Sequence, residues 1–474
     1  MFIGREAELK SLENLYGKEG FQMLVLYGRR RIGKTALLSH FCKGKRTLFF
    51  TAEQKNDTDN LRSFSRAIWS FFGERDDNPT FDSWANALGY LADHCPRDER
   101  TVFVFDEFPY AAAANPSLPS TLQIAIDHTF KRSNLMLALC GSNEGFMESE
   151  VLGYKSPLYG RRTSQIRLKP FDYQDTARLL GGYSPEEHAA YYAVFGGTPY
   201  YLEQIDRSLP LAENVQRLMF DISGILYAEP QMLIRQELRE PATYTSVLDA
   251  IGSGATHPKQ IAERAGIDPA AVSNYLSALV RLGLVTREVP FGEDPSRSRK
   301  GLYYLSDPFF SYWYRFVSPY IGAIEAGLGE AAAKIATQGD GFSTYVGTQF
   351  EDICRQWLTN QAGAGNLPFL PLEIGRWWGT DPSIRERVDI DVVAGNKTSG
   401  HLCVGECKYR SRFNESEAIQ TLEHRATLIP GFKQTHHVLF MKGEPSSETS
   451  RKAGDRLDLS IVTLADIYLD VTEQ

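Results

Sequence analysis

The stretch Gly28-Arg29-Arg30-Arg31-Ile32-Gly33-Lys34-Thr35 matches the pattern G-x-x-x-x-G-K-[ST], and its surroundings give the match a structural meaning. An apolar run at residues 23–27 precedes it, and a helix-forming segment at residues 36–41 follows it. In a strand–loop–helix unit of this kind, backbone N–H groups turn toward phosphate oxygens at a helix N-terminus, whose dipole favours anions. Lys34 would neutralise the terminal phosphates, and the Thr35 hydroxyl would ligate Mg²⁺. The loop therefore predicts a site for a nucleoside triphosphate, with a simple glycine turn as the alternative.

A second stretch supplies the other half of such a site. The run Thr101-Val102-Phe103-Val104-Phe105 is continuously β-branched and aromatic, which predicts a buried parallel strand, and Asp106-Glu107 follow at its end. We expect this strand to lie beside the loop strand, where a carboxylate can hold Mg²⁺. We assign Asp106 to the metal and Glu107 to orienting the attacking water. An acidic pair at a strand end can also be merely solvated, but two motifs in the right order favour hydrolysis.

Other polar positions are weaker candidates for the same site. The apolar run at residues 135–140 predicts a third strand, which ends at Gly141-Ser142-Asn143. Ser142 or Asn143 would sense the terminal phosphate, and a strand-terminating turn is an equally good interpretation. Arg161 and Arg162 place two guanidiniums in a loop, where one could fork onto phosphate oxygens in cis or on a neighbour's nucleotide in trans. An exposed arginine pair is more often only a solvated surface.

The order of these motifs is similar to that of a known family. The segments concerned are Phe2-Ile3-Gly4-Arg5-Glu6-Ala7-Glu8-Leu9, the arginine-rich loop, Phe105-Asp106-Glu107-Phe108, Cys140-Gly141-Ser142 and Gly196-Gly197-Thr198-Pro199-Tyr200-Tyr201-Leu202. Together they resemble the archaeal-type ATPases, which are AAA+-related members of the STAND signalling group. The resemblance covers the first half of the chain and implies ATP as the nucleotide. It also implies that Phe2, Ile3, Gly4 and Arg5 lie against the adenine, and that Gly197 and Pro199 close the pocket from a helical lid.

Length and composition limit the possible classes of protein. A chain of 474 residues exceeds what one hydrophobic core usually serves, so several domains are expected. The net charge of −8 argues against a protein that coats nucleic acid through bulk positive charge, so any DNA contact needs a local patch. The six cysteines show no metal-ligand spacing, no apolar stretch approaches the roughly 20 residues of a membrane span, and no signal-peptide pattern is present. We expect a soluble cytoplasmic protein without membrane contact.

From about residue 244 the pattern changes to short helices. Helical segments are expected at residues 246–251, 258–266 and 268–280, and two strand-like runs at residues 282–289 and 301–305 flank a polar loop. In the third helical segment Asp268 can cap the helix and Pro269 takes its first position. This order of elements predicts a winged helix-turn-helix.

The winged helix offers candidate DNA contacts. Ser273 and Asn274 on the presumed recognition helix would face a groove, and Arg297, Arg299 and Lys300 in the wing would lie on phosphates. However, the recognition helix has almost no positive charge, and winged helices inside STAND ATPases also serve as lids or packing modules. DNA binding and a structural role therefore stay equally open.

The C-terminal part carries a second set of reactive residues. Asp389-Ile390-Asp391-Val392-Val393-Ala394 and Leu402-Cys403-Val404-Gly405-Glu406-Cys407-Lys408 predict two strands joined by a turn. Residues i and i+2 of a strand share a face, so Glu406 and Lys408 point the same way, and a neighbouring strand could present Asp391 to the same point. Two carboxylates and a lysine form a site for a divalent cation that polarises a phosphodiester, with Lys408 positioning or activating the water.

This second pattern resembles the D…E-x-K core of restriction-endonuclease-like nucleases. Because it follows an ATPase and a winged helix, it is also similar to a DUF234-type C-terminal domain. The resemblance implies that Glu351, in the helical segment 347–354, is an additional metal-binding or orienting acid. The alternatives are a salt-bridge ladder on an edge strand and a degenerate nuclease fold that only binds nucleic acid.

The sequence thus predicts a multidomain α/β protein. A P-loop parallel sheet is expected over residues 1–170, a helical lid over 171–240, a winged helix-turn-helix over 241–318 and a restriction-endonuclease-like α/β domain over 319–474. The expected function is a switch that binds and hydrolyses ATP with Mg²⁺ and licenses a Mg²⁺-dependent nuclease to act on DNA. Two alternatives remain, an ATP-dependent signalling or regulatory DNA-binding protein without nuclease activity and an AAA-like motor that remodels nucleic acid or protein. An arginine that acts in trans would require a homo-oligomer.

Overall fold

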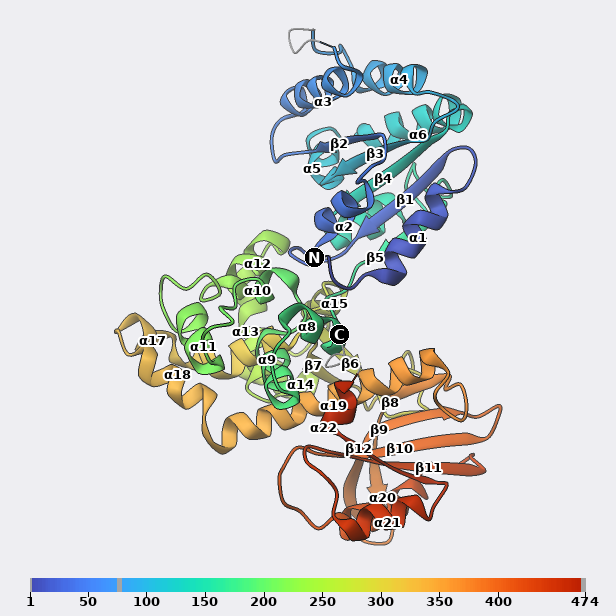
Figure 1. The fold of residues 1–474 in the computed structure, drawn as a ribbon. Helices are drawn as coiled ribbons and strands as arrows, with labels where there is room; N and C mark the ends of the chain where they lie inside the picture. Colours follow the sequence, from blue (N-terminus) through green and yellow to red (C-terminus); the bar gives the residue numbers. More distant parts are fainter. Residues whose placement is uncertain (1, 75–78, 470–474) are drawn as a thin grey trace. The chain divides into compact units, whose positions relative to one another are not determined.

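The computed structural model describes residues 2–74 and 79–469 and divides into two compact units, residues 1–170 and 171–474. We describe each unit by itself (Figure 1).

The first unit is built on a parallel sheet of five strands in the order β2-β3-β4-β1-β5. The strands are β1 (Gln22–Tyr27), β2 (Thr47–Thr51), β3 (Thr101–Asp106), β4 (Leu135–Gly141) and β5 (Ser164–Arg167). Every residue of β1, β3 and β4 is buried, as their continuous apolar runs predict. Because the strands are parallel, the segments that follow β1, β3 and β4 meet at the same edge of the sheet.

Helices cover both faces of this sheet (Figure 1). The helical segments of the unit are α1 (Glu6–Tyr16), α2 (Lys34–Phe41), α3 (Asp57–Phe72), α4 (Trp84–His94), α5 (Phe108–Ala114), α6 (Leu118–His128), η1 (Phe130–Arg132), α7 (Glu144–Phe146) and η2 (Met147–Val151). One face carries a largely aromatic core in which Phe64 stacks on Trp84 and Phe103. The other face is aliphatic and packs Leu24 and Val104 against α1 and α2.

The second unit begins with helices and a winged helix. The first helices are α8 (Tyr173–Leu180), α9 (Pro185–Phe195), α10 (Pro199–Leu202), α11 (Leu211–Met219) and α12 (Glu229–Glu237). The winged helix comprises α13 (Pro241–Gly252), α14 (Pro258–Ala265), α15 (Val272–Arg281) and the antiparallel pair β6 (Val285–Glu288) and β7 (Leu302–Leu305). It leads into α16 (Pro308–Tyr312), η3 (Trp313–Val317), η4 (Ser318–Tyr320), α17 (Ile321–Glu325), α18 (Gly329–Thr337) and α19 (Gly339–Ala364).

A five-stranded mixed sheet completes the second unit, in the order β12-β11-β10-β9-β8. Its elements are β8 (Glu373–Asp381), β9 (Glu386–Asn396), β10 (His401–Lys408), β11 (Gln434–Met441) and β12 (Leu459–Thr463), with α20 (Glu415–Ala426), α21 (Ser447–Gly454) and α22 (Leu464–Ile467). The strands β8, β9 and β10 are antiparallel, whereas β10, β11 and β12 are parallel. The two faces of this sheet pack in different cores: Val392, Ala394 and Cys403 pack with residues of α19, whereas Ile390, Val393, Leu402 and Val404 pack with residues of α20. The predicted multidomain α/β class, with a parallel sheet, a winged helix and a separate C-terminal mixed sheet, is confirmed.

The helix α19 joins three parts of the second unit. Its Tyr345 hydroxyl donates to the Ala193 carbonyl at 2.8 Å, and its Gln356 Nε2 donates to the Tyr192 hydroxyl at 2.9 Å. Tyr192 and residues of α8 also share a hydrophobic core with α19 and the C-terminal sheet. The helices that precede the winged helix are therefore packed directly on the C-terminal domain.

The base of the wing is attached to the outer strand of the C-terminal sheet. The Phe291 N–H donates to the Arg376 carbonyl at 2.9 Å, at a point where the β8–β9 pairing is irregular. The Gly292 N–H donates to Glu373 Oε1 at 2.8 Å, and the Phe291 ring is buried in the core beneath α20. One side of the wing is thus part of the C-terminal domain's edge.

The described residues include no helix whose length and apolar character would let it cross a membrane.

Candidate functional site

The glycine-rich loop lies between β1 and α2, where the sequence places it. Gly28 has a φ of 150°, and a Cβ there would lie 2.4 Å from the Leu168 carbonyl oxygen and 2.6 Å from Ile32 Cδ1. Gly33 has a φ of 90° immediately before the first residue of α2. Both positions thus need glycine, the first for close approach and the second for its left-handed backbone.

Lys34 points back into the loop. Its Nζ donates to the carbonyls of Gly28 at 2.8 Å and Arg29 at 2.9 Å, and the residue is buried. Burial lowers the pKa of the ammonium, and the nearby carboxylates of Glu107 and Asp106 oppose that change. The loop therefore holds a desolvated positive charge at its centre.

Thr35 and Asp106 meet at the same edge of the sheet. The Thr35 hydroxyl donates to Asp106 Oδ2 at 2.9 Å, and Asp106 Oδ1 accepts from the Glu107 N–H at 3.0 Å. The expectation that β3 lies directly beside the loop strand is wrong, because β4 pairs with both and separates them. Asp106 nevertheless reaches Thr35, since parallel strands bring their carboxyl ends to one edge. The hydroxyl and carboxylate oxygens form a donor set that suits Mg²⁺.

Glu107 is held by Ser142. The Ser142 hydroxyl donates to Glu107 Oε1 at 2.5 Å and its N–H lies 3.4 Å from Oε2. Glu107 has a left-handed backbone, with a φ of 50°, immediately before α5. Of the two sensor candidates, Asn143 accepts from the Phe146 N–H at 2.8 Å and so caps α7. Ser142 is therefore the one whose side chain contacts the predicted catalytic acid.

The N-terminal motif packs on the loop and on α2. Arg5 is buried and donates to the Ile32 carbonyl at 3.1 Å, while the Phe2 ring stacks on His40 with centroids 4.2 Å apart. Gly4 has a φ of 70°. The contact of Phe2, Ile3, Gly4 and Arg5 with adenine stays a prediction.

The three loop arginines differ in their surroundings. Arg29 is buried, Arg30 donates to the Tyr110 hydroxyl, and Arg31 has a left-handed backbone with a φ of 69°.

In the second unit, the Gly197 carbonyl accepts from the Phe171 N–H at 2.7 Å, and a Cβ on Gly197 would lie 1.8 Å from the Phe171 oxygen. Pro199 begins α10. The closing of the nucleotide pocket by Gly197 and Pro199 stays a prediction.

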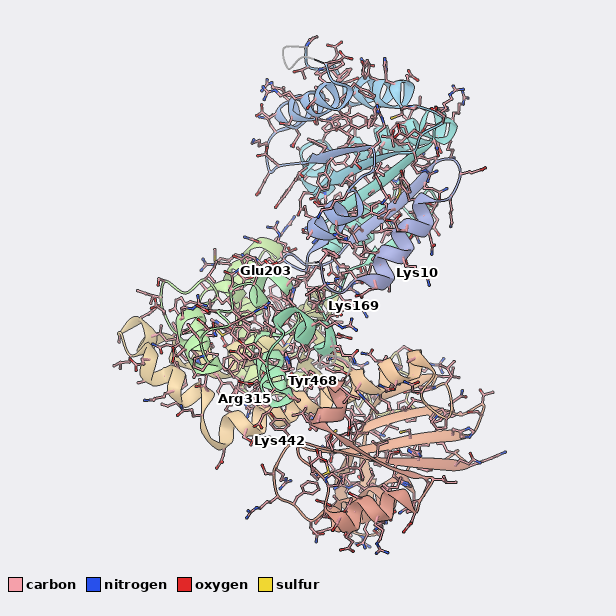
Figure 2. The ribbon with its side chains drawn as sticks, viewed as in Figure 1. Lys10, Lys169, Glu203, Arg315, Lys442 and Tyr468 are labelled. Carbon is pink, nitrogen blue, oxygen red and sulfur yellow. The ribbon has the colours of Figure 1, made fainter. Side chains whose placement is uncertain are left out.

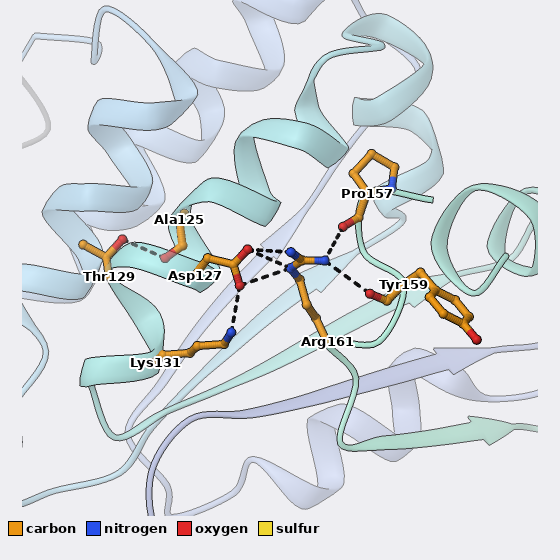
Figure 3. Close-up of polar contacts among 7 residues, drawn as sticks. All are labelled: Ala125, Asp127, Thr129, Lys131, Pro157, Tyr159 and Arg161. Carbon is orange, nitrogen blue, oxygen red and sulfur yellow. Dashed lines mark hydrogen bonds and ion pairs between the residues drawn. The ribbon is translucent and has the colours of Figure 1, made fainter. Parts of the chain in front are cut away.

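Arg161 is engaged away from the loop (Figure 3). Its guanidinium forks onto Asp127, with Nη2 2.5 Å from Oδ2 and Nε 3.2 Å from Oδ1, and also donates to the Pro157 and Tyr159 carbonyls. Arg161 and Arg162 precede β5, whose first residue pairs with Leu24 of β1. The loop follows the other end of β1, so the two arginines lie on the order of 15 Å away along the strand direction. The Arg161 guanidinium is therefore held by Asp127, and a role of Arg162 at the nucleotide stays a prediction.

The contacts of Arg161 lead to a prediction. Arg161→Ala should keep ATP turnover within about twofold of the wild-type rate and lower the free energy of unfolding by at most about 1 kcal/mol. Because the Arg161 hydrogen bonds hold the pKa of Asp127 at about 2, this stability difference should be full above pH 4 and vanish as the pH falls toward 2. Turnover assays and urea titrations measure the two effects. A tenfold or larger loss of turnover would instead support an arginine that acts in trans.

The C-terminal acids converge on one face of the sheet. The pairing of β10 with β9 ends where Gly405 is opposite Val392, and Glu406 and Asp391 are the residues that follow this last pair on the two strands. The Cys407 N–H donates to Asp391 Oδ2 at 2.8 Å. Lys408 Nζ forms an ion pair with Glu406 Oε1. The three residues of the predicted D…E-x-K pattern therefore come together.

Burial and mutual repulsion shift the acids of this cluster. Burial, followed by the charge of Glu406, raises the pKa of Asp391 to about 6. Burial, followed by the charge of Asp391, raises the pKa of Glu351 to about 8. Glu351 thus lies in the field of the same carboxylates.

Two arginines brace this carboxylate cluster, and the sequence interpretation missed both. Arg355 Nη1 donates to the Asp391 carbonyl at 2.7 Å, and Arg425 Nη1 lies 3.6 Å from Glu406 Oε2. The i,i+4 spacing from Glu351 to Arg355 was a signal that could have identified the first.

Within residues 2–74 and 79–469, no three His, Cys, Asp or Glu side chains are grouped so as to hold a metal ion. The cluster is therefore an ion-paired network, whose oxygens suit a hard cation once Lys408 and Arg425 move away.

The candidate DNA contacts of the winged helix are exposed. Ser273 and Asn274 lie on the solvent face of α15. In the wing, Lys300 Nζ is 2.6 Å from Glu293 and Arg297 Nε is 3.6 Å from Asp294, while Arg299 is exposed. Neighbouring acids therefore offset much of the wing's positive charge.

Three parts of the chain match known protein families. Residues 2–205 match a family described as an ATPase domain predominantly from Archaea, residues 241–294 match the MarR family, and residues 313–420 match archaeal and bacterial proteins of unknown function. An uncharacterized protein of Methanocaldococcus jannaschii is 30% identical over 414 residues, which are 86% of this chain and 88% of that protein. The chain belongs to the archaeal-type ATPase family. The predicted resemblance is thus confirmed, and the archaeal-type ATPase is a P-loop ATPase with a MarR-like winged helix and a DUF234-type domain.

Two further known proteins are similar to this chain. An uncharacterized ATP-binding protein of the same organism is 41% identical over 46 residues, which are 10% of this chain and 78% of that protein. A Walker-type ATPase of Pyrococcus abyssi aligns in structure with a TM-score of 0.49 and 20% identity, covering 66% of this chain and 96% of that one.

Proposed function

We propose that this archaeal-type ATPase is an ATP-dependent switch whose C-terminal domain is a Mg²⁺-dependent nuclease that acts on DNA. The observation that carries this proposal is the convergence of Asp391, from the middle of β9, with Glu406 and Lys408, from the end of β10, with Glu351 in the same electrostatic environment. Carboxylates beside a lysine suit the positioning and activation of water against a phosphodiester.

In the ATPase unit each motif has a proposed role. Lys34 transfers its hydrogen bonds from the loop carbonyls to the terminal phosphates, and Thr35 and Asp106 hold Mg²⁺. When bound, this ion offsets the negative charge that develops on the phosphates. Glu107 orients the attacking water and accepts its proton, and Ser142 holds Glu107 until a nucleotide is in place. Phe2, Ile3, Gly4, Arg5 and the loop arginines line the nucleotide, and Gly197 and Pro199 close over it.

In the C-terminal domain Asp391, Glu406 and Glu351 are the residues that would hold a catalytic Mg²⁺, which would polarise the phosphodiester. Lys408 and Arg425 offset the charge of Glu406 in the resting state. Once displaced from Glu406, Lys408 is free to hold the attacking water. The helix α19 carries Glu351 and contacts Tyr192 and Ala193 of the preceding helices, which gives a physical route from a nucleotide-dependent lid to this site.

The winged helix positions DNA in this scheme. Ser273 and Asn274 contact base edges, and Arg297, Arg299 and Lys300 contact phosphates. The proposed domains are the ATPase core (1–170), the lid (171–240), the winged helix (241–318) and the nuclease-like domain (319–474). A homo-oligomer completes the ATP site only if an arginine is supplied in trans.

A regulator without nuclease activity is the second candidate. The observation that favours it is the pairing of Glu406 with two cations, together with the lack, within the described residues, of a group of side chains ready to hold a metal. In that case nucleotide state would change DNA binding alone.

Cleavage of supercoiled plasmid separates these candidates. Wild-type chain with ATP and Mg²⁺ or Mn²⁺ should nick the plasmid, and Lys408→Ala should lower the rate at least about a hundredfold. Lys397→Ala, which removes an exposed turn lysine, is the matched control and should keep the wild-type rate. If the plasmid stays intact with every metal and nucleotide, the nuclease is excluded and the regulator stands.

A further inference from the structure

A polar cavity in the second unit shares Glu351 with the carboxylate cluster, and most of its other lining residues have no role in the nuclease scheme above. Its volume is about 440 Å³, which lies within the range of small-molecule sites. It is enclosed by the winged-helix strands, the start of α16, the helix α19 and β8. The charged and aromatic residues that line it are Tyr192, Glu288, Tyr304, Arg315, Tyr345, Glu351, Asp352, Arg355 and Arg376.

Two carboxylates in this cavity have unused hydrogen-bonding capacity. Glu288 Oε2 is buried without a hydrogen-bond partner, Arg376 Nη1 is 3.8 Å away, and the charge of Arg355 also acts on this carboxylate. In the part of the chain that the structure describes, the Glu351 carboxylate makes no hydrogen bond or ion pair. A buried acceptor without a donor is costly, so Glu288 favours a ligand that brings an N–H group, and the Glu351 carboxylate can accept a second one.

The remaining walls suit a flat and partly anionic ligand. Tyr304 and Tyr345 are among the lining residues, and the Arg376 guanidinium lies 5.4 Å from the Tyr304 ring centre. Arg315 lies at its exposed margin with its guanidinium 5.8 Å from the Tyr345 ring centre, and it is labelled in Figure 2. In the described structure no carboxylate pairs with Arg315. It is therefore available to an incoming anion.

The position of Arg376 limits the kind of donor that can approach Glu288. An ammonium group beside Glu288 would also lie close to the Arg376 guanidinium and would be repelled by it. A neutral amino group on an aromatic ring supplies N–H donors without that repulsion. The cavity thus favours an aromatic amine that carries an anionic group elsewhere.

We propose that the cavity binds one nucleotide whose base has an exocyclic amino group. The amino group donates to Glu288 and Glu351, the base lies against Tyr304 and Tyr345, and the phosphate meets Arg315. A free nucleotide and a nucleotide of a DNA strand share this chemistry. Binding of a nucleotide within a DNA strand rests on the proposed action on DNA, whereas binding of a free nucleotide does not.

Binding of two mononucleotides to the full-length chain tests this site. The Lys34→Ala background keeps the probes out of the P-loop, and EDTA removes divalent cations. By calorimetry dCMP should bind at least about tenfold more tightly than dTMP, because thymine lacks the amino group. Short oligonucleotides of dC and of dT are measured in the same way. The cavity proposal is overturned if neither the mononucleotides nor the oligonucleotides show a higher affinity for cytosine than for thymine.

Variants of the lining residues assign the contacts. In this background Glu288→Gln should reduce the preference for dCMP at least about threefold, whereas Arg315→Gln should weaken both nucleotides to a similar extent. Glu263→Gln, on the exposed face of α14, is the matched control and should change neither affinity. A dCMP preference that survives both Glu288→Gln and Glu351→Gln would place the nucleotide elsewhere and overturn the proposal.

The oligonucleotides also identify the source. Preference for dC that appears only in the oligonucleotide supports a nucleotide held within a strand, and equal affinity for free dCMP supports a free nucleotide. Since these measurements contain no metal and no cleavage step, an uncut plasmid would count against the nuclease and not against this cavity.

Discussion

Glu107→Gln should lower ATP turnover at least about a hundredfold and leave ATP affinity nearly unchanged. The amide keeps the size of the side chain and can still accept the Ser142 hydroxyl, but it does not take a proton from water. The hydrogen bond of 2.9 Å from the Thr35 hydroxyl to Asp106 Oδ2 does not involve Glu107, so the substitution leaves it in place. Phosphate release at saturating ATP measures the turnover, and calorimetry with a non-hydrolysable analogue measures the affinity.

The control for this variant is Glu150→Gln, which changes an exposed acid of η2 beyond the end of β4. It should hydrolyse ATP at the wild-type rate. Retained turnover in Glu107→Gln would show that another acid activates the water, and the Ser142 contact would then be structural only.

Lys34→Ala should lower ATP affinity at least about a hundredfold, which corresponds to about 2.7 kcal/mol of binding free energy. The variant loses the buried ammonium at the centre of the loop and leaves the Gly28 and Arg29 carbonyls without their donor. Fluorescence of a labelled ATP analogue measures the affinity, and thermal unfolding confirms that the chain is folded.

Lys43→Ala is the matched variant, because Lys43 is exposed just beyond the end of α2. Its affinity for ATP should equal that of the wild type. Nucleotide binding that persists in Lys34→Ala would contradict the assignment of the loop.

The parts of the two sites that the sequence predicted are those encoded by neighbouring residues. The loop is one contiguous segment, and its glycines are needed for local backbone reasons. Glu406 and Lys408 share a face because of the two-residue period of a strand, and the antiparallel pairing of β9 with β10 ends next to Asp391 and Glu406. Burial of β1, β3 and β4 follows from their continuous apolar runs.

The parts that escaped prediction depend on pairs far apart in the chain. The bond between Arg161 and Asp127 joins residues 34 positions apart, and nothing near Arg161 in the sequence indicates it. The position of β4 between β1 and β3 is a matter of sheet order, which local patterns do not encode. The cavity beside Glu288 likewise forms only where the winged helix, α19 and β8 come together.

The attachment of Phe291 to β8 affects how this chain can be divided. An outer strand with free N–H and C=O groups can pair with another molecule, and part of that strand is covered here by the backbone of residues 291–292. A recombinant fragment that starts after the winged helix would lack this cover and would leave the socket of the Phe291 ring open to water. Such a fragment should self-associate, whereas one that starts at residue 241 retains its own protective segment.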